Sequence, residues 1–233
     1  MRAESEWTVV LAVKPLRTAK SRMDGWLSAS QRAELVLAMT RDVLLAARGC
    51  TAVSRLIVVT PDPQIAQVAL EASALVLPET RATGLNAAYR RGRDMVVAEG
   101  DGPLTLLMAD LAFIRPHDLA LALEAVPPNG SAVVRDAAGQ GTTMLAARRA
   151  SEVVPQFGGR SFARHLAGGA VDITAHAETG LRADVDDVSA FSTPPSALAG
   201  SATRQWFRRL AASRVSPEPI QPQTSHEIGY RTA

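Results

Sequence analysis

The 233-residue chain is 47% apolar, which is enough to build the core of one large α/β domain. Its 25 basic residues nearly balance its 23 acidic ones, and only 4% of the residues are aromatic, so the composition argues against a nucleic-acid-binding protein. The single cysteine, Cys50, excludes an internal disulfide bond and a multi-cysteine zinc site, and the lack of any run typical of a secretory signal or a membrane span predicts a cytoplasmic protein with no membrane partner.

An apolar run from Thr8 to Val13 leads directly into a strongly basic segment. The run has the Val and Leu content of a buried parallel strand, and ligands collect beyond the carboxyl ends of such strands. The polar side chains of the segment are Lys14, Arg17, Lys20, Ser21 and Arg22. They can bind a triphosphate through point charges and planar guanidinium groups, although a solvated basic turn explains them equally well. A Gly-rich phosphate loop and a dinucleotide fingerprint are both missing, so neither a P-loop enzyme nor a classical dehydrogenase is indicated.

Predicted helices and short apolar strands alternate through the next hundred residues. Either Ser28 or Ser30 can cap a helix that ends near Gly49, with Cys50 beside its end as a small apolar residue. Further strands are predicted at residues 56–60, 75–77, 104–109 and 132–135, and helices at residues 64–72, 83–97 and 115–126. This alternation predicts a Rossmann-like α/β fold with a mostly parallel central sheet flanked by helices.

The last third of the chain has shorter predicted elements. We expect a strand at residues 142–147, a loop at 155–160, a short helix at 161–166, strands at 171–175 and 181–185, and a helix near 204–214. Residues 216–233 are rich in Pro, Gln, Ser and Thr and predict a disordered tail, so a single domain is expected to span residues 1–215.

Two groups of acidic residues are candidates for a metal site. Asp110 ends the most apolar predicted strand, which places its carboxylate at the ligand-binding edge of the sheet. Asp184 and Asp186 occupy alternate positions of an extended segment at the end of a predicted strand, and their side chains are expected to point the same way. Carboxylates from separate strands suit Mg²⁺, which takes its remaining ligands from water and substrate phosphates. The alternative for the second group is a helix N-cap cluster.

A second candidate pocket lies around the predicted helix at residues 161–166. Thr142, Gly158 and Ser161 bring hydroxyl and backbone N–H groups near its start, which suits an anion, although ordinary helix capping explains the same residues. None of the four histidines shows a spacing typical of a metal pair or a nucleophile partner. A Gly-x-Ser-x-Gly elbow is also missing, so covalent hydrolase chemistry has little support.

Six short motifs, taken in order, resemble one enzyme family. They are V-K-P-L-x-x-A-K-S-R-M at 13–23, G-L-N at 84–86, A-D-L at 109–111, G-T at 141–142, F-G-x-x-S at 157–161 and D-V-D at 184–186. This ordered set resembles the guanylyltransferases of deazaflavin coenzyme F-420 biosynthesis, which act on 2-phospho-L-lactate or phosphoenolpyruvate. The resemblance spans about residues 8 to 190 and implies a single-domain nucleotidyltransferase of the nucleotide-diphospho-sugar transferase type.

The resemblance also implies roles for individual residues. The expected GTP-binding residues are Lys14, Lys20, Ser21, Arg22 and Asn86. The acceptor, a small phosphorylated three-carbon acid, is expected at Thr142, Gly158 and Ser161, and Mg²⁺ at Asp110 with Asp184 or Asp186. Lys20, Arg22 and Asp110 are the expected catalytic residues, because a transfer between phosphates depends on positioning and charge stabilisation.

The sequence departs from the family pattern at three places. Ala112 replaces a frequent Pro, Thr143 a frequent Asn, and Asp187-Val188 a frequent Thr-Pro. The last change leaves open which of Asp184 and Asp186 binds the metal, and Thr143 is positioned to alter the choice of acceptor.

Several alternatives stay open at the level of sequence. Phosphoenolpyruvate, 2-phospho-L-lactate and 3-phosphoglycerate each offer one phosphate and one carboxylate, and the Ala- and Arg-rich, bacterial-looking composition favours the first. A related nucleotidyltransferase acting on a sugar phosphate or the molybdenum cofactor is the second enzyme interpretation, and a non-catalytic nucleotide-binding relative is the third. A reactive product predicts hand-over to a downstream transferase, and a homodimer is compatible with the sequence.

Overall fold

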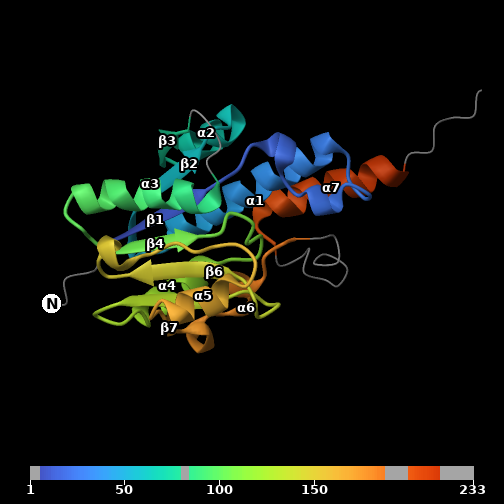
Figure 1. The fold of residues 1–233 in the computed structure, drawn as a ribbon. Coiled ribbons are helices and arrows are strands. Elements are labelled where there is room, and N and C mark those ends of the chain that lie inside the picture. The colour runs from blue at the N-terminus through green and yellow to red at the C-terminus, as the bar shows by residue number, and fades with distance from the viewer. Residues whose placement is uncertain (1–5, 80–83, 187–198, 216–233) are drawn as a thin grey trace, which may run out of the picture.

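A computed structural model describes residues 6–79, 84–186 and 199–215 of the chain. Within that part of the chain, seven strands form one sheet in the order β3-β2-β1-β4-β6-β5-β7 (Figure 1). The strands are β1 Trp7–Ala12, β2 Val53–Thr60, β3 Leu75–Pro78, β4 Leu104–Leu107, β5 Ser131–Arg135, β6 Thr142–Ala147 and β7 Val171–Asp172. Of these, only β6 pairs antiparallel with its neighbours, β4 and β5. The mostly parallel sheet predicted from the sequence is therefore confirmed.

Helices cover both faces of this sheet (Figure 1). They are α1 Ala29–Gly49, α2 Pro63–Glu71, α3 Leu85–Ala98, α4 Pro116–Glu124, α5 Ser161–Ala167, α6 Thr179–Arg182 and α7 Ser201–Val215. Helices α1, α2, α4 and α7 belong to one apolar core, and α3 and α5 pack on the other face. Strand β1 is buried along its whole length and its side chains alternate between the two cores, Val9 to one and Val10 to the other. This explains its uninterrupted apolar sequence.

The helix starts follow from local capping chemistry. Of the two candidate serines, Ser28 caps α1: its hydroxyl accepts from the backbone N–H of Gln31 at 3.2 Å, and the Gln31 side chain accepts from the N–H of Ser28 at 2.9 Å. Asp62 caps α2, with Pro63 at the first helical position. Cys50 is buried directly after α1, as predicted.

The predicted strand at residues 181–185 is wrong. Leu181 and Arg182 end helix α6, and residues 183–186 form no regular element. Leu181 and Val185 are both fully buried, so their spacing of four fits a helical turn as well as it fits a strand. Gly180 explains the close packing of this turn, since a Cβ there would lie 2.4 Å from the backbone oxygen of Phe113.

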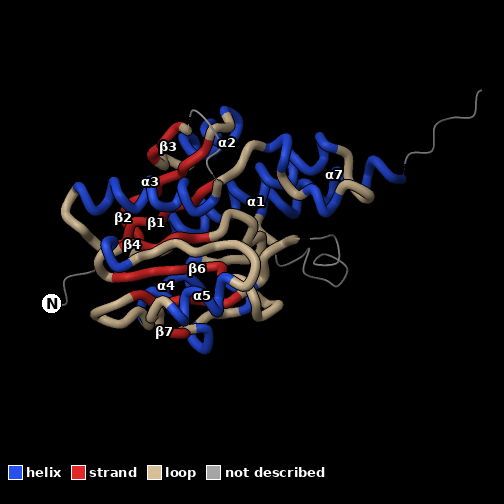
Figure 2. The backbone as a smooth tube through the Cα atoms, in the orientation of Figure 1, coloured by secondary structure: helices blue, strands red, loops and turns tan. Residues whose placement is uncertain are grey.

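Strand β7 is also shorter than predicted, because Thr174–His176 forms a turn of 3-10 helix. Figure 2 shows this end of the sheet carrying short helical turns and loops. The other predicted elements are present with boundaries shifted by a few residues. The predicted disordered tail at residues 216–233 and the pair Asp187-Val188 lie outside the described residues.

No helix in the described ranges combines the length and the apolar character that crossing a membrane requires.

Candidate active site

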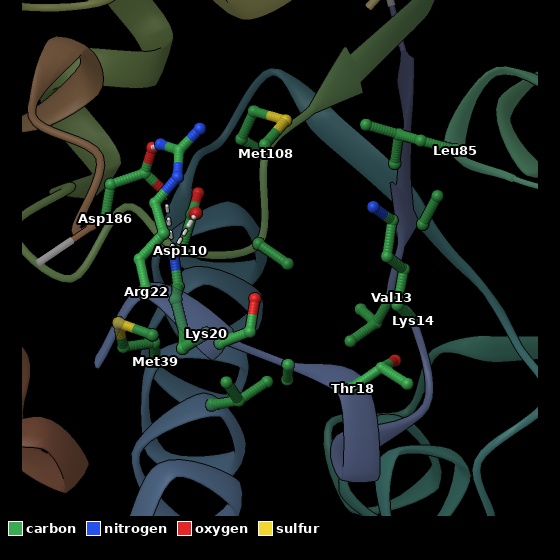
Figure 3. Close-up of a pocket in the computed structure, with 15 residues that line it drawn as sticks. Val13, Lys14, Thr18, Lys20, Arg22, Met39, Leu85, Met108, Asp110 and Asp186 are labelled. Atoms are coloured by element: carbon green, nitrogen blue, oxygen red, sulfur yellow. Dashed lines mark hydrogen bonds and ion pairs between the residues drawn. The ribbon is translucent and has the colours of Figure 1, made fainter. Parts of the chain in front are cut away.

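A cleft of about 280 Å³ opens at the carboxyl ends of β1 and β4 (Figure 3). The chain runs from β1 outward through β2 and β3, and then returns to place β4 on the other side of β1. The crevice at such a reversal of strand order is where open α/β sheets bind ligands. Polar side chains from three segments line it: Lys14, Thr18, Lys20, Ser21, Arg22, Asp110 and Asp186.

Lys20 is the central cation of the cleft. Its Nζ lies 2.6 Å from Asp110 Oδ2 and 3.1 Å from Asp186 Oδ1, and its side chain is only 11% exposed. Burial by itself lowers the pKa of this ammonium group, but the two carboxylates outweigh burial and raise the pKa, so Lys20 keeps its proton. The backbone of Lys20 has the left-handed conformation, with φ 51° and ψ 41°. Residues other than glycine rarely adopt this backbone conformation, and such residues cluster at functional sites.

The remaining basic residues are more exposed. Arg22 Nη1 lies 2.9 Å from Asp186 Oδ2, which extends the ion-pair network to the rim of the cleft. Lys14 and Ser21 also line the cleft and are exposed, and Figure 3 shows Lys14 across the cleft from the acids. Arg17 is exposed and does not line it. The predicted nucleotide-binding residues of the basic segment therefore share one cleft.

The acidic residues converge on the same place from two segments. Asp110 follows β4, and its backbone carbonyl accepts a hydrogen bond from the N–H of Val185 at 3.2 Å, which brings residues 184–186 to the cleft. The pKa of Asp184 is raised to about 6, first by burial and then by repulsion from Asp110 and Asp186. The carboxylates are therefore close enough to interact, although Asp184 does not itself line the cleft.

Thr142 comes to this edge of the sheet through the one antiparallel strand. Because β6 runs against β4, the start of β6 lies beside the end of β4, where Leu107 pairs with Met144. Pairing with β5 passes from Met144 directly to Thr142, so Thr143 is the extra residue of a bulge. Bulges re-aim side chains next to functional sites. Here the Thr142 hydroxyl lies 2.9 Å from Nδ1 of His165 on α5.

Gly158 and Ser161 lie in and after the loop that precedes α5. The backbone of Gly158 has φ 118°, a conformation that favours glycine, and its carbonyl accepts from the N–H of Ser161 at 3.0 Å. Ser161 is buried, whereas Gly158 is exposed. The backbone N–H of Phe162 donates to the carbonyl of Gln140 at 3.1 Å, which ties the start of α5 to the turn before Thr142. The three predicted acceptor residues thus belong to one connected region.

Asn86 connects α3 to this region. Its Oδ1 accepts from the N–H of Phe157 at 2.7 Å, and its Nδ2 donates to the carbonyl of Phe157 at 3.0 Å. Both ends of the side-chain amide therefore bind the loop that carries Gly158. Leu85, one residue earlier, lines the cleft. The role of Asn86 in nucleotide binding stays a prediction, and the contacts that the structure gives it are with Phe157 in the loop that carries Gly158.

His165 is the residue that the sequence did not single out. It is 2% exposed, and both ring nitrogens have partners: Nδ1 meets the Thr142 hydroxyl, and Nε2 accepts from the N–H of Gln156 at 2.9 Å. Burial, and secondly the charge of Arg164, lower the pKa of its imidazole to about 4. The sequence feature that could have pointed to His165 is its position four residues after Ser161, because this spacing places both residues on one face of α5.

The fold and the cleft define a nucleotidyltransferase-like α/β protein. Among solved structures, a protein of Desulfovibrio desulfuricans G20 assigned as a nucleotide-diphospho-sugar transferase matches with a TM-score of 0.64 and 13% identity, covering 89% of this chain and 96% of that one. A nucleotidyl transferase from Methanothermobacter matches with a TM-score of 0.55 and 18% identity, covering 88% and 99%. At these identities the matches show the fold alone.

Sequence comparison identifies the family. The family model described as "Guanylyl transferase CofC like" matches residues 7–188, and the chain belongs to this family. The phosphoenolpyruvate guanylyltransferase of Nocardia farcinica is 39% identical over 216 residues, which cover 91% of this chain and 95% of that protein. The phosphoenolpyruvate guanylyltransferase of Salinispora arenicola is 41% identical over 182 residues, covering 77% and 83%.

Proposed function

We propose that this protein transfers GMP from GTP to phosphoenolpyruvate and releases pyrophosphate, as a step of coenzyme F-420 biosynthesis. The observation that carries the proposal is the convergence of Lys20 and Arg22 with Asp110 and Asp186 in one cleft at the reversal of strand order. Cations that bind a triphosphate and carboxylates that bind a metal are the two groups that nucleotidyl transfer requires. The names of the relatives, which are 39% to 41% identical, support the donor and the acceptor.

The reaction needs no nucleophile from the protein. An oxygen of the acceptor phosphate attacks the α-phosphorus of GTP, a new O–P bond forms, and the bond from the α-phosphorus to the bridging oxygen breaks, so pyrophosphate leaves. The acceptor phosphate is ionised near neutral pH, so no proton has to be removed first. Catalysis therefore rests on holding the two substrates in line and on stabilising charge.

Lys20 is the residue best placed to stabilise that charge. Its ammonium stays protonated, it is mostly buried, and its ion pairs with Asp110 and Asp186 hold the ammonium in the cleft. Arg22 lies at the exposed rim, where its guanidinium can pair with a phosphate of the incoming nucleotide. Lys14 and Ser21 complete the polar lining of the same cleft.

The acidic residues fit Mg²⁺. Oδ1 of Asp110 is buried without a hydrogen-bond partner among the described residues, and burial, followed by repulsion from the neighbouring carboxylates, raises the pKa of Asp184. A hard cation would provide a partner for Oδ1 of Asp110 and would reduce the repulsion between the carboxylates. It would be held by Asp110 with Asp184 or Asp186. In the described part of the chain, no three acidic, histidine or cysteine side chains form a complete metal site, so substrate oxygens and water would supply further ligands. When bound, Mg²⁺ would neutralise negative charge on the phosphates.

The acceptor fits the region of Thr142, Gly158 and Ser161. Two hydroxyl groups and a glycine backbone suit a small anion that carries both a phosphate and a carboxylate. These groups do not themselves distinguish phosphoenolpyruvate from 2-phospho-L-lactate or 3-phosphoglycerate. Phosphoenolpyruvate is the acceptor named for the relatives, and it is the one we propose.

One assay tests this function against its alternatives. Pyrophosphate release is measured with each of the four nucleoside triphosphates and Mg²⁺, across a panel of three-carbon phospho-acids and sugar phosphates. We expect release with GTP and phosphoenolpyruvate. Pyrophosphate release that depends on a sugar phosphate would identify a different nucleotidyltransferase. No release in any combination would indicate a non-catalytic nucleotide-binding protein.

The proposal extends to the setting of the reaction. We place it in the cytoplasm, where GTP and Mg²⁺ are supplied. The guanylylated enol phosphate hydrolyses readily in water, so the product is expected to pass directly to a downstream transferase. A homodimer is part of the same proposal, and sedimentation of the purified protein tests it.

A further inference from the structure

The loop at residues 155–160, which carries Gly158, is held by side chains from two helices. Asn86 on α3 makes two hydrogen bonds to the backbone of Phe157. From α5, Arg164 donates to the carbonyl of Gln156 at 2.8 Å and also contacts the carbonyl of Gly159. His165 Nε2 accepts from the N–H of Gln156. The loop is therefore held by side-chain hydrogen bonds at Gln156, Phe157 and Gly159.

The bond from Gln156 fixes the protonation of His165. A backbone N–H can only donate, so Nε2 must present its lone pair and carries no proton. A neutral imidazole has one N–H, and it must then be on Nδ1. Nδ1–H in turn donates to the Thr142 hydroxyl oxygen, 2.9 Å away. The low pKa of the buried ring agrees with the neutral form.

This assignment sets the direction of the Thr142 hydroxyl group. Because its oxygen accepts from His165, its own proton points elsewhere, and no described residue accepts that proton. A ligand oxygen at this edge of the sheet would be a suitable acceptor. The ring of His165 also packs edge-on against Phe157, with the ring centroids 5.2 Å apart, so the imidazole has little freedom to turn.

We propose that His165 is a positioning residue for the phospho-acid: it holds the loop at Gln156 and orients the Thr142 hydroxyl group so that this group donates to the acceptor. The inference rests on the proposed function, since it deepens the account of that same acceptor region. His165 acts through Thr142 and Gln156 and does not itself touch the reacting atoms.

A pair of substitutions separates the two bonds of the ring. His165→Gln keeps an acceptor near the position of Nε2 and removes the donor to Thr142, whereas His165→Asn keeps a donor near Nδ1 and removes the acceptor. We expect His165→Gln to raise KM for phosphoenolpyruvate about tenfold, the effect of one lost hydrogen bond, and to change KM for GTP less than twofold. His165→Asn keeps the donor to Thr142 and loses only the bond to Gln156, so we expect its KM for phosphoenolpyruvate to rise less than that of His165→Gln.

Thr142→Val provides the matched control. If His165 acts through the Thr142 hydroxyl group, the double variant His165→Gln, Thr142→Val should be no weaker than Thr142→Val alone. A purely structural role would instead raise both KM values together, and the two substitutions would add. Either of those results, or unchanged kinetics in His165→Gln, would overturn the inference.

A spectroscopic measurement on the unsubstituted protein does not depend on how a variant folds. Long-range proton–nitrogen correlation of ¹⁵N-labelled histidine should show the proton of His165 on Nδ1 at pH 7. A proton on Nε2 would contradict the proposed network. If the unsubstituted protein releases no pyrophosphate with any phospho-acid, the proposed function fails, and the ring assignment still reports separately on the network.

Discussion

The candidate active site has two halves, one proposed for the nucleotide and one for the acceptor, and they differ in charge and in burial. The nucleotide half consists mainly of charged side chains that form ion pairs: Lys20 and Asp110 are largely buried, and Arg22 and Asp186 at the rim are 77% and 52% exposed. The acceptor half consists of neutral groups that, apart from the exposed Gly158, are almost completely buried, with Ser161 1% and His165 2% exposed. Exposed charges contribute little to folding, whereas buried hydrogen bonds are costly to break. The nucleotide half is therefore expected to be specialised for catalysis, and the acceptor half to serve folding and binding together.

Asp110→Asn is the sharpest test of the nucleotide half. The substitution keeps the size of the side chain and removes the charge that pairs with Lys20 and that would bind Mg²⁺. We expect kcat to fall on the order of 10³-fold, as when a charge-stabilising group is removed, while the melting temperature stays within a few degrees. Steady-state pyrophosphate release and thermal unfolding measure the two effects. Near-normal turnover would remove Asp110 from the mechanism.

Lys20→Ala should lower kcat on the order of 10²-fold. Arg17→Ala is the matched control, because Arg17 belongs to the same basic segment, is exposed and does not line the cleft. Its turnover should stay within twofold of the unsubstituted protein. If both variants lose activity equally, the basic segment acts through its net charge, and the position of Lys20 has no special importance.

Because it contains the buried imidazole of His165, the acceptor half should make the free energy of unfolding depend on pH. In the folded protein the pKa of His165 is about 4, below the ordinary value of 6.5, so between these values the unfolded chain binds a proton that the folded protein does not. Stability is therefore full above pH 6.5 and falls as the pH drops towards 4, by about 3 kcal/mol for a shift of this size.

Urea unfolding of the unsubstituted protein and of His165→Phe at pH 7 and pH 4 isolates this effect. Other titrating groups, Asp184 among them, are common to both proteins and cancel in the difference. The destabilisation caused by His165→Phe should shrink at the lower pH, since the variant has no imidazole to protonate. An equal difference at both pH values would show that His165 titrates normally.

Asn86→Ala decides which half this residue serves. The side-chain amide binds the backbone of Phe157 twice, so its loss should loosen the acceptor loop and raise KM for phosphoenolpyruvate about tenfold. A rise in KM for GTP with no change for the acceptor would instead support the nucleotide-binding role that the family motif implies. Asn86→Asp, which keeps an acceptor for the N–H of Phe157, should be the milder change.

The contrast between the charged nucleotide half and the buried, neutral acceptor half also explains which features could be predicted from the sequence. The position of Asp110 at the ligand-binding edge of the sheet was predictable, because it follows an apolar strand, whereas the charge of the segment that carries Lys20 left a phosphate site and a solvated turn equally open. The alternation of elements likewise predicted the mostly parallel sheet. Leu181 to Val185 was misassigned, because apolar residues four apart suit both a strand and a helical turn. His165 was overlooked, because its importance depends on Thr142 and Gln156, which only the folded chain brings to its ring.

The smallest expected effect concerns the stability supplied by the ion pair of Arg22 and Asp186. Both side chains are more than half exposed, so solvent screens their attraction even though the nitrogen–oxygen distance is 2.9 Å. Arg22→Ala should therefore change the free energy of unfolding by less than about 0.5 kcal/mol, while it weakens GTP binding. Urea unfolding and the KM for GTP measure the two quantities in the same variant. A loss of stability comparable to that of His165→Phe at pH 7 would show that the charged half also holds the fold together, and the division between the two halves would not stand.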